Sequence, residues 1–474
     1  MMDKEEFRKY GYQMIDWMVD YYENIESFPV KSQVKPGDII QQIPKDAPIN
    51  GEAFENIFED FKNIILPGIT HWQHPNFHAY FPANTSFPSQ LAEMLMSAMG
   101  AQCMIWETSP AAAELEEQVM NWIKKLSAIP QNWQGVIQDT ASTATLAAIL
   151  TARENKSDYK INKQGFNGEK FRIYCSTETH SSIEKAVKIA GLGSENLVKV
   201  PCDAKAAMIP EELEKAIESD IMNGITPLVV IAAVGTTGTL GIDPIASLGK
   251  ICNQYNIWLH VDAAYAGTAM LLPEYQYMIN GIELADSYVL NPHKWMFTNF
   301  DCTAYFVKDA EALINTFEIL PEYLKTKTEG QVNNYRDWGI PLGRRFRALK
   351  LWFVIRSFGV SGIQETLRRH MQLTDNLSKV IEQHHQFELI VPTTLNTICF
   401  RYIDSSLSND ELDTFNEKLI HSINESGEAY LTHTKFNGKY TIRLVIGQTY
   451  VKRENIEKSW EVILKHTEKL KITK

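Results

Sequence analysis

The chain has 474 residues, of which 44% are hydrophobic and 22% charged, an ordinary globular composition that excludes a disordered, collagen-like or coiled-coil protein. Its length predicts about two or three domains. The formal net charge of −12 argues against nucleic acid or anionic lipid as the main partner, because binding phosphates requires a basic surface.

The cysteine spacing and the N-terminal residues predict the cellular compartment. The six cysteines form no CxxC pair, which predicts buried thiols in a reducing compartment rather than a disulfide framework. The N-terminus is charged from its third residue and no run of 18 apolar residues occurs, so neither a signal peptide nor a transmembrane helix is expected. Pro75 breaks helical spacing between His74 and His78, so no metal site is expected. We expect a soluble cytoplasmic protein.

Residues 1–86 predict a helical segment without strands. Apolar residues from Phe7 to Tyr22 recur at spacings of three and four, which predicts one helix over residues 4–26. A Pro-rich stretch follows, and a second helix is predicted near residues 52–65, before Pro67. Because this segment cannot close a core alone, we expect it to pack on a larger body, such as a partner subunit.

From residue 87 to residue 350, short apolar runs alternate with helical segments. Strands are predicted at 135–138, 171–175, 227–234 and 257–261. Helices are predicted at 144–153, 183–190 and 210–219. Continuous apolar strands that alternate with helices are typical of an α/β domain around a largely parallel sheet.

The pattern changes after residue 350. Helices are predicted at 349–358 and 364–385, and strands at 390–391, 398–402, 430–434 and 440–446. Asn437-Gly438, between the last two strands, is a strong hairpin signal. Residues 351–474 therefore predict a small α+β domain. The long polar loop 321–337 is typical of a lid or a disordered segment.

The segment SYVLNPHKW places Lys294 directly after an apolar strand. Desolvation there lowers the pKa of a lysine and makes it a nucleophile toward carbonyls, although a lone lysine is more often a surface residue. Asp262 ends the apolar strand of NIWLHVDAAYAG, and small residues that would let a flat ring approach follow it. A carboxylate at this place can hold a pyridine nitrogen protonated, which makes pyridoxal phosphate an electron sink; the alternative is a turn cap.

Three further polar groups follow strand ends. The stretch DTAS at 139–142 begins a helix, whose first amides and hydroxyls form either an anion site or a plain cap. His180 can stack on a ring, meet a substrate carboxylate or be structural. Thr236, Thr237 and Asp243 follow another strand. Open α/β sheets bind ligands beyond strand ends, so these groups predict one cleft for a phosphate, a ring and a Schiff base.

These segments resemble the group II pyridoxal-phosphate (PLP)-dependent amino-acid decarboxylases, in particular the aromatic-L-amino-acid decarboxylases, nearly end to end. The resemblance rests on HPNFHAYFPANTS, SPAAAELE, GVIQDTAS, HVDAAYAG, NPHKW, NFDC and IPLGRRFRALKLWF. It implies a homodimer of PLP fold type I, similar to aspartate aminotransferase, with the active site at the subunit interface. The implied parts are a helical segment on the partner subunit (1–86), a large PLP-binding α/β domain (87–350) and a small α+β domain (351–474).

The resemblance also implies roles for individual residues. Lys294 forms the Schiff base with PLP, Asp262 pairs with the pyridinium, and His180 stacks on the ring and faces the substrate carboxylate. The implied phosphate-site residues are Ala141, Ser142, Asn291 and His293, with Thr140 beside them.

Further positions follow from the same resemblance. Thr237 and Asp243 match positions near the ring, and Gln102 and Met104 are expected to enter the neighbouring subunit's pocket. Tyr323 matches the mobile-loop tyrosine that protonates the quinonoid at the substrate Cα. The alternative for Tyr323 is an aromatic side chain that anchors a lid by packing.

Aromatic residues near the start of the chain predict the substrate class. Trp72, Tyr80, Phe81, Pro82 and Met104 are expected to line a flat apolar pocket, although the 72–82 stripe alone is typical of ordinary core. Ala83 stands where mammalian dopa decarboxylases have a threonine near the catechol, which favours tryptophan, phenylalanine or tyrosine. Gly343 matches a position where glycine leaves room for bulky rings, which disfavours histidine.

Three other functions remain open. An aldehyde synthase uses the same scaffold, but its family members are associated with phenylalanine at the position of Tyr323. A glutamate-like substrate needs a cation for its distal carboxylate, which the aromatic wall does not offer. A non-catalytic binding protein does not require the whole set of site residues. Arg443 is expected to be structural, and the basic run 343–356 is expected to be a solvated or interface helix face.

Overall fold

The computed structural model describes residues 2–319 and 330–472, so Tyr323 lies outside the described residues. Contacts divide the chain into two compact units. The first comprises the chain up to Pro82, Asn376–Glu388 and the chain from Phe400; the second comprises Ala83–Asp375 and Leu389–Cys399. This division differs from the predicted boundaries near 87 and 350, because the N-terminal segment groups with the C-terminal part.

The first unit contains the two predicted N-terminal helices and most of a small sheet. Its helices are α1 (Lys4–Glu23), α2 (Phe54–Asp60), α13 (Asn409–Ser426) and α14 (Arg453–Ile472). The sheet has the order β10-β11-β9-β8, with strands β8 (Phe387–Leu389), β9 (Thr397–Tyr402), β10 (Thr432–Phe436) and β11 (Lys439–Val445). Asn437 and Gly438 both have positive φ and join β10 to β11 in the predicted hairpin. The strand predicted at 390–391 was wrong, since β8 ends at Leu389.

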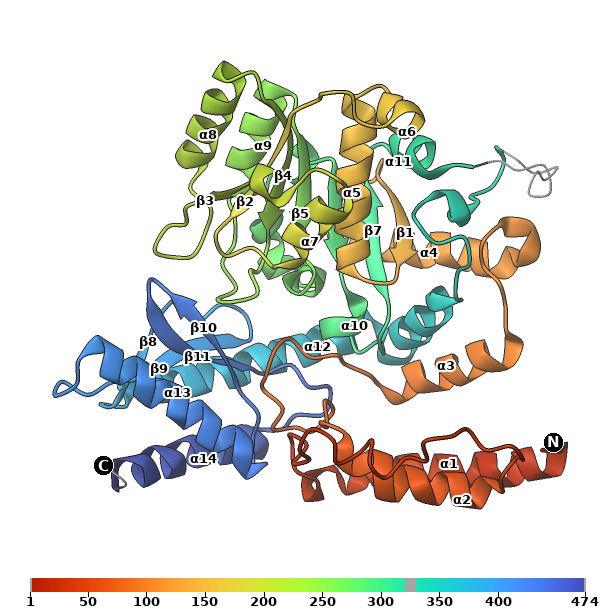
Figure 1. The fold of residues 1–474 in the computed structure, drawn as a ribbon, viewed down its shortest axis with the longest axis vertical. Helices are drawn as coiled ribbons and strands as arrows, with labels where there is room; N and C mark the ends of the chain where they lie inside the picture. Colours follow the sequence, from red (N-terminus) through yellow and green to blue (C-terminus); the bar gives the residue numbers. More distant parts are fainter. Residues whose placement is uncertain (1, 320–329, 473–474) are drawn as a thin grey trace. The chain divides into compact units, whose positions relative to one another are not determined.

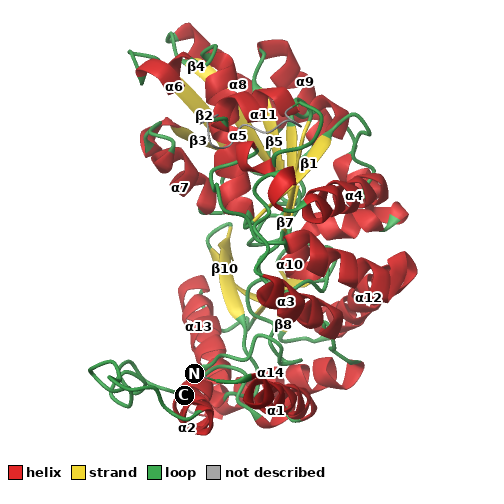
Figure 2. Ribbon diagram, turned by 90° about the vertical axis from the view of Figure 1, so that its right-hand side faces the viewer, coloured by secondary structure: helices red, strands yellow, loops and turns green. Residues whose placement is uncertain are grey.

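The second unit is built on a seven-stranded, mostly parallel sheet (Figures 1 and 2). Its strands are β1 (Gln134–Gln138), β2 (Phe171–Ser176), β3 (Leu197–Val200), β4 (Thr226–Ala233), β5 (Trp258–Asp262), β6 (Ser287–Leu290) and β7 (Thr303–Val307). The order is β1-β7-β6-β5-β4-β2-β3, and β7 alone runs in the opposite direction to the other strands. The predicted α/β class and the four predicted strands are confirmed.

The helices of this unit are α3 (Phe87–Met99), α4 (Pro110–Leu126), α5 (Ala141–Lys156), α6 (Lys160–Gln164), α7 (Ser182–Ile189), α8 (Pro210–Met222), α9 (Ile245–Tyr255), α10 (Pro292–Trp295), α11 (Ala310–Phe317) and α12 (Arg347–Gln383), the last turns of which belong to the first unit. Helices α4, α5, α8 and α9 pack on the strands of the sheet. Strand order and right-handed crossovers place α5 and α7 on one face and α8 and α9 on the other. Gly359, at φ 65°, breaks α12 between the two helices predicted there.

The topology brings most of the predicted site segments to one edge of the sheet. Because β1 and β6 both run antiparallel to β7, β1 points the same way as β2–β6. The chain therefore leaves β1, β2, β4, β5 and β6 at the same end, which we call the carboxyl edge; the opposite end is the amino edge. In Figure 1, α10 lies at this carboxyl edge, at the lower end of the sheet.

Candidate active site

Lys294 lies on α10, one short turn beyond the end of β6. Asn291 begins this turn, its backbone N–H donating to Ala264 O (3.0 Å) and its carbonyl accepting from the Lys294 N–H (2.9 Å). Lys294 is partly buried between the fully buried His293 and Trp295. The turn therefore fixes the backbone of Lys294 to the segment that follows Asp262.

Asp262 ends the adjacent strand, opposite Val289 of β6. Its carboxylate is half-buried; Oδ1 accepts from the Ala264 N–H (3.0 Å), and within residues 2–319 and 330–472 Oδ2 takes no hydrogen bond. The small residues after it mostly serve internal packing rather than ring access. A Cβ on Gly267 would lie 2.5 Å from Leu290 Cβ, and among these alanines only Ala264 is accessible.

His180 follows β2 and is electrostatically linked to both groups. Its Nδ1 accepts from the Ser182 N–H (3.2 Å) and lies 2.7 Å from Ser182 Oγ, which places the ring hydrogen on Nε2. Partial burial and the charge of Lys294 lower the pKa of His180, against an opposing effect of Asp262. The structure therefore brings Lys294, Asp262 and a neutral His180 together at the carboxyl edge.

The start of α5 carries the predicted anion site. Thr140 is the N-cap, and its Oγ1 accepts from the Thr143 N–H (3.4 Å), so the capping alternative describes its side chain. Ser142 is exposed, and its hydroxyl makes no hydrogen bond within the described chain. The N–H groups of Ala141 and Ser142 belong to the first turn of the helix, where amides lack internal partners.

His293 has a buried, neutral ring, and one of its two nitrogens accepts a hydrogen bond from the protein. Its Nδ1 accepts from the Cys302 N–H (2.9 Å), which leaves the hydrogen on Nε2. Burial and the charge of Lys294 lower the pKa of His293 to about 3. The Asn84 N–H donates to the His293 carbonyl (3.1 Å), fixing the backbone beside Lys294. The side chain of Asn291, by contrast, accepts from Thr303 Oγ1 (2.8 Å).

Both carboxylate oxygens of Asp243 accept hydrogen bonds from the backbone, one of them from a strand of the sheet. Asp243 is buried, and its two oxygens accept from the N–H groups of Met208 and Ala233, both at 2.7 Å. Burial raises its pKa to about 7, against the effect of these two bonds. Because Ala233 pairs with Asp262, Asp243 supports the strand end beside that carboxylate. Thr237 is partly buried in the turn that leads to it.

Gln102 and Gly343 line a separate, smaller cavity of this unit. Gln102 Oε1 accepts from the Arg344 N–H (2.7 Å), and Gln102 and Gly343 both line a cavity of about 310 Å³. Met104 is partly buried and accepts the Arg336 N–H through its carbonyl (2.9 Å). The lining of this cavity contains neither Lys294 nor Asp262.

The predicted substrate wall forms an aromatic cluster in the first unit. The rings of Trp72 and Tyr80 stack with centroids 5.7 Å apart, and Tyr80 contacts Tyr430, which the sequence did not single out. Arg443 donates to the Tyr80 carbonyl (2.7 Å) and lies over the Phe81 ring, in the structural role expected. Pro82 ends this unit, and Ala83 begins the other.

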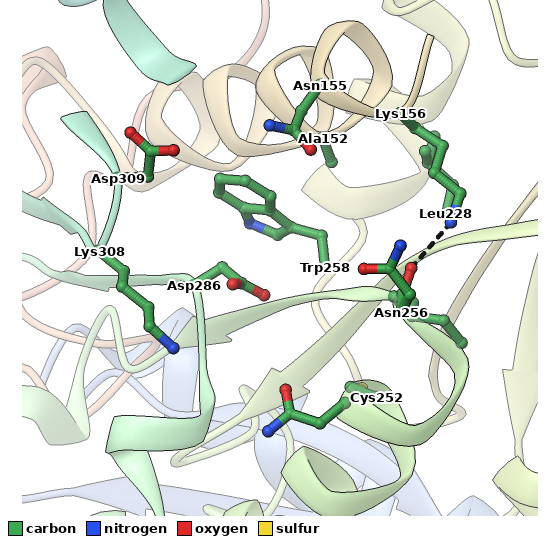
Figure 3. Close-up of a pocket in the computed structure, with 12 residues that line it drawn as sticks. Ala152, Asn155, Lys156, Leu228, Cys252, Asn256, Trp258, Asp286, Lys308 and Asp309 are labelled. Atoms are coloured by element: carbon green, nitrogen blue, oxygen red, sulfur yellow. Dashed lines mark hydrogen bonds between the residues drawn. The ribbon is translucent and has the colours of Figure 1, made fainter. Parts of the chain in front are cut away.

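A larger cavity of about 720 Å³ lies at the amino edge (Figure 3). Trp258, at the start of β5, lies at its centre, with Asn155 above and Asp286 below in the view. None of the predicted site residues lines it. Within the described parts of the chain, no cluster of three histidine, cysteine or acidic residues is arranged to hold a metal, and no helix is long and apolar enough to cross a bilayer.

The expectation for the basic run 343–356 was wrong for Arg344 and Lys350, whereas Arg345 and Arg356 are exposed as expected. We expected a solvated or interface helix face, but Arg344 is buried and pairs with Glu116 (2.6 Å), and Arg347 pairs with Asp301 (2.8 Å). Lys350 is fully buried against Glu93 (3.1 Å). The sequence hides these pairings because each carboxylate lies far along the chain. The apolar neighbours of Lys350, Leu349 and Leu351, were the available signal of burial.

The residues of the carboxyl edge fit PLP by the chemistry of their donors. The Lys294 amine and the Asp262 carboxylate both act electrostatically on His180, and one Asp262 oxygen takes no hydrogen bond in the described chain; an aldehyde requires such an amine and a pyridine nitrogen such a carboxylate. The first amides of α5, the Ser142 hydroxyl and the Nε2–H of His293 are all donors, as a phosphate requires. The fold and this edge define a PLP-dependent enzyme.

Comparison with known proteins then gives the family. The family model described as "Pyridoxal-dependent decarboxylase conserved domain" matches residues 36–403. The chain belongs to the pyridoxal-dependent decarboxylase family, and PLP is its cofactor.

Similar proteins match along nearly the whole chain. It is 40% identical to a tyrosine decarboxylase of Papaver somniferum, covering 98% of this chain and 95% of that protein. It is also 40% identical to a phenylacetaldehyde synthase of Arabidopsis thaliana, covering 98% and 96%. The solved structure of Oryza sativa TDC with PLP and tryptamine superposes with a TM-score of 0.95 at 31% identity, covering 99% of both chains.

Proposed function

We propose that this enzyme removes the carboxylate of aromatic L-amino acids as CO2 and releases the arylalkylamine. The supporting observation is the grouping of Lys294, Asp262 and a neutral His180 at the carboxyl edge, in a chain 40% identical to a tyrosine decarboxylase. The expected substrates are tryptophan, phenylalanine, tyrosine and their hydroxylated relatives.

The cofactor supplies an electron sink for the electron pair of the bond to the departing carboxylate. Lys294 would hold the cofactor through its aldehyde carbon. Asp262 keeps the pyridine nitrogen protonated through the carboxylate oxygen without a hydrogen bond in the described chain. Ser142, the first amides of α5 and His293 Nε2–H bind the phosphate.

Other residues act on the substrate. The neutral His180 ring is expected to face its carboxylate without fixing it by charge, which favours the loss of CO2. Tyr323 donates the proton that Cα requires after CO2 leaves; a phenol with a pKa of about 10 remains protonated at neutral pH. The aromatic side chains of Trp72, Tyr80 and Phe81 are assigned the selection of a flat ring.

The proposed enzyme is a cytoplasmic homodimer. In the single chain, the side chains of Phe7 (70% exposed) and Tyr12 (67% exposed) on helix α1 are not covered by the rest of their unit. Such exposed apolar side chains are typical of a surface that a partner covers. Gln102 and Met104 would then complete the partner's site. Size-exclusion chromatography with light scattering tests this, since a monomer at working concentration contradicts it.

A second candidate is an aldehyde synthase, because one relative at 40% identity is a phenylacetaldehyde synthase. That reaction consumes O2 and releases ammonia and peroxide besides CO2. Tyr323 favours the amine, and the Tyr323→Phe variant is expected to shift product from amine toward aldehyde. An unchanged amine yield in that variant would contradict the proton-donor role.

Mass spectrometry of products tests the function directly. The PLP-loaded enzyme is incubated separately with tryptophan, tyrosine, phenylalanine, dopa, histidine and glutamate. Amines from the aromatic acids alone support the proposal and rank the substrates. Aldehydes move the function to the oxidative branch, and products from glutamate overturn the aromatic assignment.

A further inference from the structure

A fully buried lysine lies behind the proposed phosphate site. Lys350 of α12 has no exposed side-chain surface, and its Nζ donates to Glu93 Oε2 of α3 (3.1 Å). Helices α3 and α12 lie beside each other in Figures 1 and 2. Burying a charged pair costs desolvation that its attraction seldom exceeds, so we expect its effect in geometry more than in stability.

Glu93 connects this lysine to the segment that follows Lys294. The same carboxylate accepts from Asn299 Nδ2 (3.1 Å) and also pairs with Arg345. The Asn299 N–H donates to Ser89 Oγ of α3 (2.9 Å). The backbone and the side chain of Asn299 are therefore both held by α3, and Lys350 orients the carboxylate that does so.

The segment held in this way ends at the group that sets the tautomer of His293. Two residues before Asp301 comes Asn299, and directly after Asp301 comes Cys302, whose N–H donates to His293 Nδ1 (2.9 Å). The His293 N–H in turn donates to the Cys302 carbonyl (3.3 Å). A shift of Cys302 would leave the neutral ring free to place its hydrogen on Nδ1, where it cannot reach the phosphate.

We propose that Lys350 and Glu93 are positioning residues for the phosphate of PLP, acting through Asn299 and Cys302 to keep His293 in its Nε2–H form. The inference rests on the proposed role of His293 and adds the lysine and the carboxylate that maintain it. Neither residue contacts the cofactor itself.

Equilibrium binding of two cofactor forms to the full-length protein tests this inference. One probe is PLP and the other is pyridoxal, which has the same ring and aldehyde but no phosphate. In Lys350→Met, the Kd of PLP is expected to rise roughly 10- to 100-fold, the range for losing a partner of a hydrogen bond to a charged group. The Kd of pyridoxal is expected to change less than about twofold. Equal weakening of both forms, or of neither, would overturn the inference.

The chain provides a matched control in Lys124. This lysine of α4 is also buried, and its Nζ donates to the carbonyls of Gln131 (3.0 Å) and Trp133 (2.8 Å), with no bond to the 299–302 segment. Lys124→Met is expected to leave the Kd of PLP unchanged. Glu93→Gln is the milder partner variant; it retains an oxygen acceptor and is expected to weaken PLP about threefold to tenfold without affecting pyridoxal.

His293→Ala separates this inference from the proposed function. If His293→Ala leaves the Kd of PLP unchanged, the phosphate role of His293 is wrong, and the inference with it. If it weakens PLP while Lys350→Met does not, the inference alone is wrong. Because Lys350 acts through His293, adding Lys350→Met to His293→Ala is expected to produce no further weakening. Additive effects would mean an independent structural role.

Discussion

The two edges of the seven-stranded sheet differ: the larger cavity lies at the amino edge, and the proposed site lies at the carboxyl edge. The amino edge holds a cavity of about 720 Å³, and three of the polar side chains that line it bond to nearby protein. Asp286 accepts from the Leu259 N–H (2.8 Å), Trp258 Nε1 donates to Ser287 Oγ (3.0 Å), and Lys308 Nζ donates to the Glu283 carbonyl (3.3 Å).

The carboxyl edge leaves bonding capacity unused. Within the described parts of the chain, one oxygen of Asp262 and the hydroxyl of Ser142 make no hydrogen bond, and His293 keeps one N–H to donate. These donors and acceptors lie at the edge where open α/β sheets bind ligands, and we propose that they bind the cofactor there. Paired substitutions at the two edges can break or sharpen this comparison.

The largest difference is expected between two lysines. Lys294→Ala should lower turnover on the order of 10,000-fold and remove the visible absorbance of the bound cofactor, because the amine that holds the aldehyde is gone. Lys308→Ala, at the amino edge, should keep both. Steady-state assays and absorbance spectra measure this; a Lys294→Ala variant with more than a tenth of normal activity would refute the assignment.

Two aspartates form the second pair. Asp262→Asn should lower kcat on the order of 1,000-fold, because an amide cannot hold the pyridine nitrogen protonated. Asp286→Asn should keep kcat and cost about 1 kcal/mol of unfolding free energy, since its carbonyl still accepts from Leu259. Comparable losses of kcat in both variants would mean that the two edges do not differ in function.

The sequence predicted which residues follow the strand ends, because those signals are local. Buried strands are visible in the sequence as apolar runs, and residues such as Asp262 and Lys294 lie at or just beyond the ends of these runs. Because parallel strands end at the same edge of a sheet, the topology alone places such residues at one edge. The tautomer of His293 was hidden, since it depends on the Cys302 N–H across a turn. The segment NFDC was part of the family resemblance, but its residue types do not predict that the Cys302 N–H donates to His293.

Long-range charge pairs were the part that sequence reasoning could not supply. The basic run 343–356 has the composition of a solvated helix face, yet Lys350 and Arg344 are buried against Glu93 and Glu116. Their partners lie more than 200 positions earlier in the chain. No periodicity connects residues at that separation, and only the packing of α3 and α4 against α12 and the preceding loop reveals the pairs.

The pH dependence of stability tests the buried carboxylate beneath the carboxyl edge. Asp243 has a folded pKa of about 7, above its ordinary 3.8, so the folded state binds more protons between these values. Its contribution to stability is complete below about pH 4 and is lost as pH rises through 7. Wild type should lose about 3 kcal/mol relative to Asp243→Asn between pH 4.5 and pH 7. Denaturant unfolding at both pH values measures this, and a pH-independent difference would contradict the raised pKa.

The smallest effect compares two hydroxyls in the first turn of α5, one engaged and one available. Thr140→Ala removes the N-cap and should cost about 1 kcal/mol of unfolding free energy, with little change in PLP affinity. Ser142→Ala removes a hydroxyl that caps nothing in the described chain; it should leave stability unchanged and raise the Kd of PLP about fivefold to tenfold. Calorimetry and PLP titration of both variants separate the two roles. If Ser142→Ala instead destabilised the fold and bound PLP normally, the Ser142 hydroxyl would be a structural group and not a donor to the phosphate.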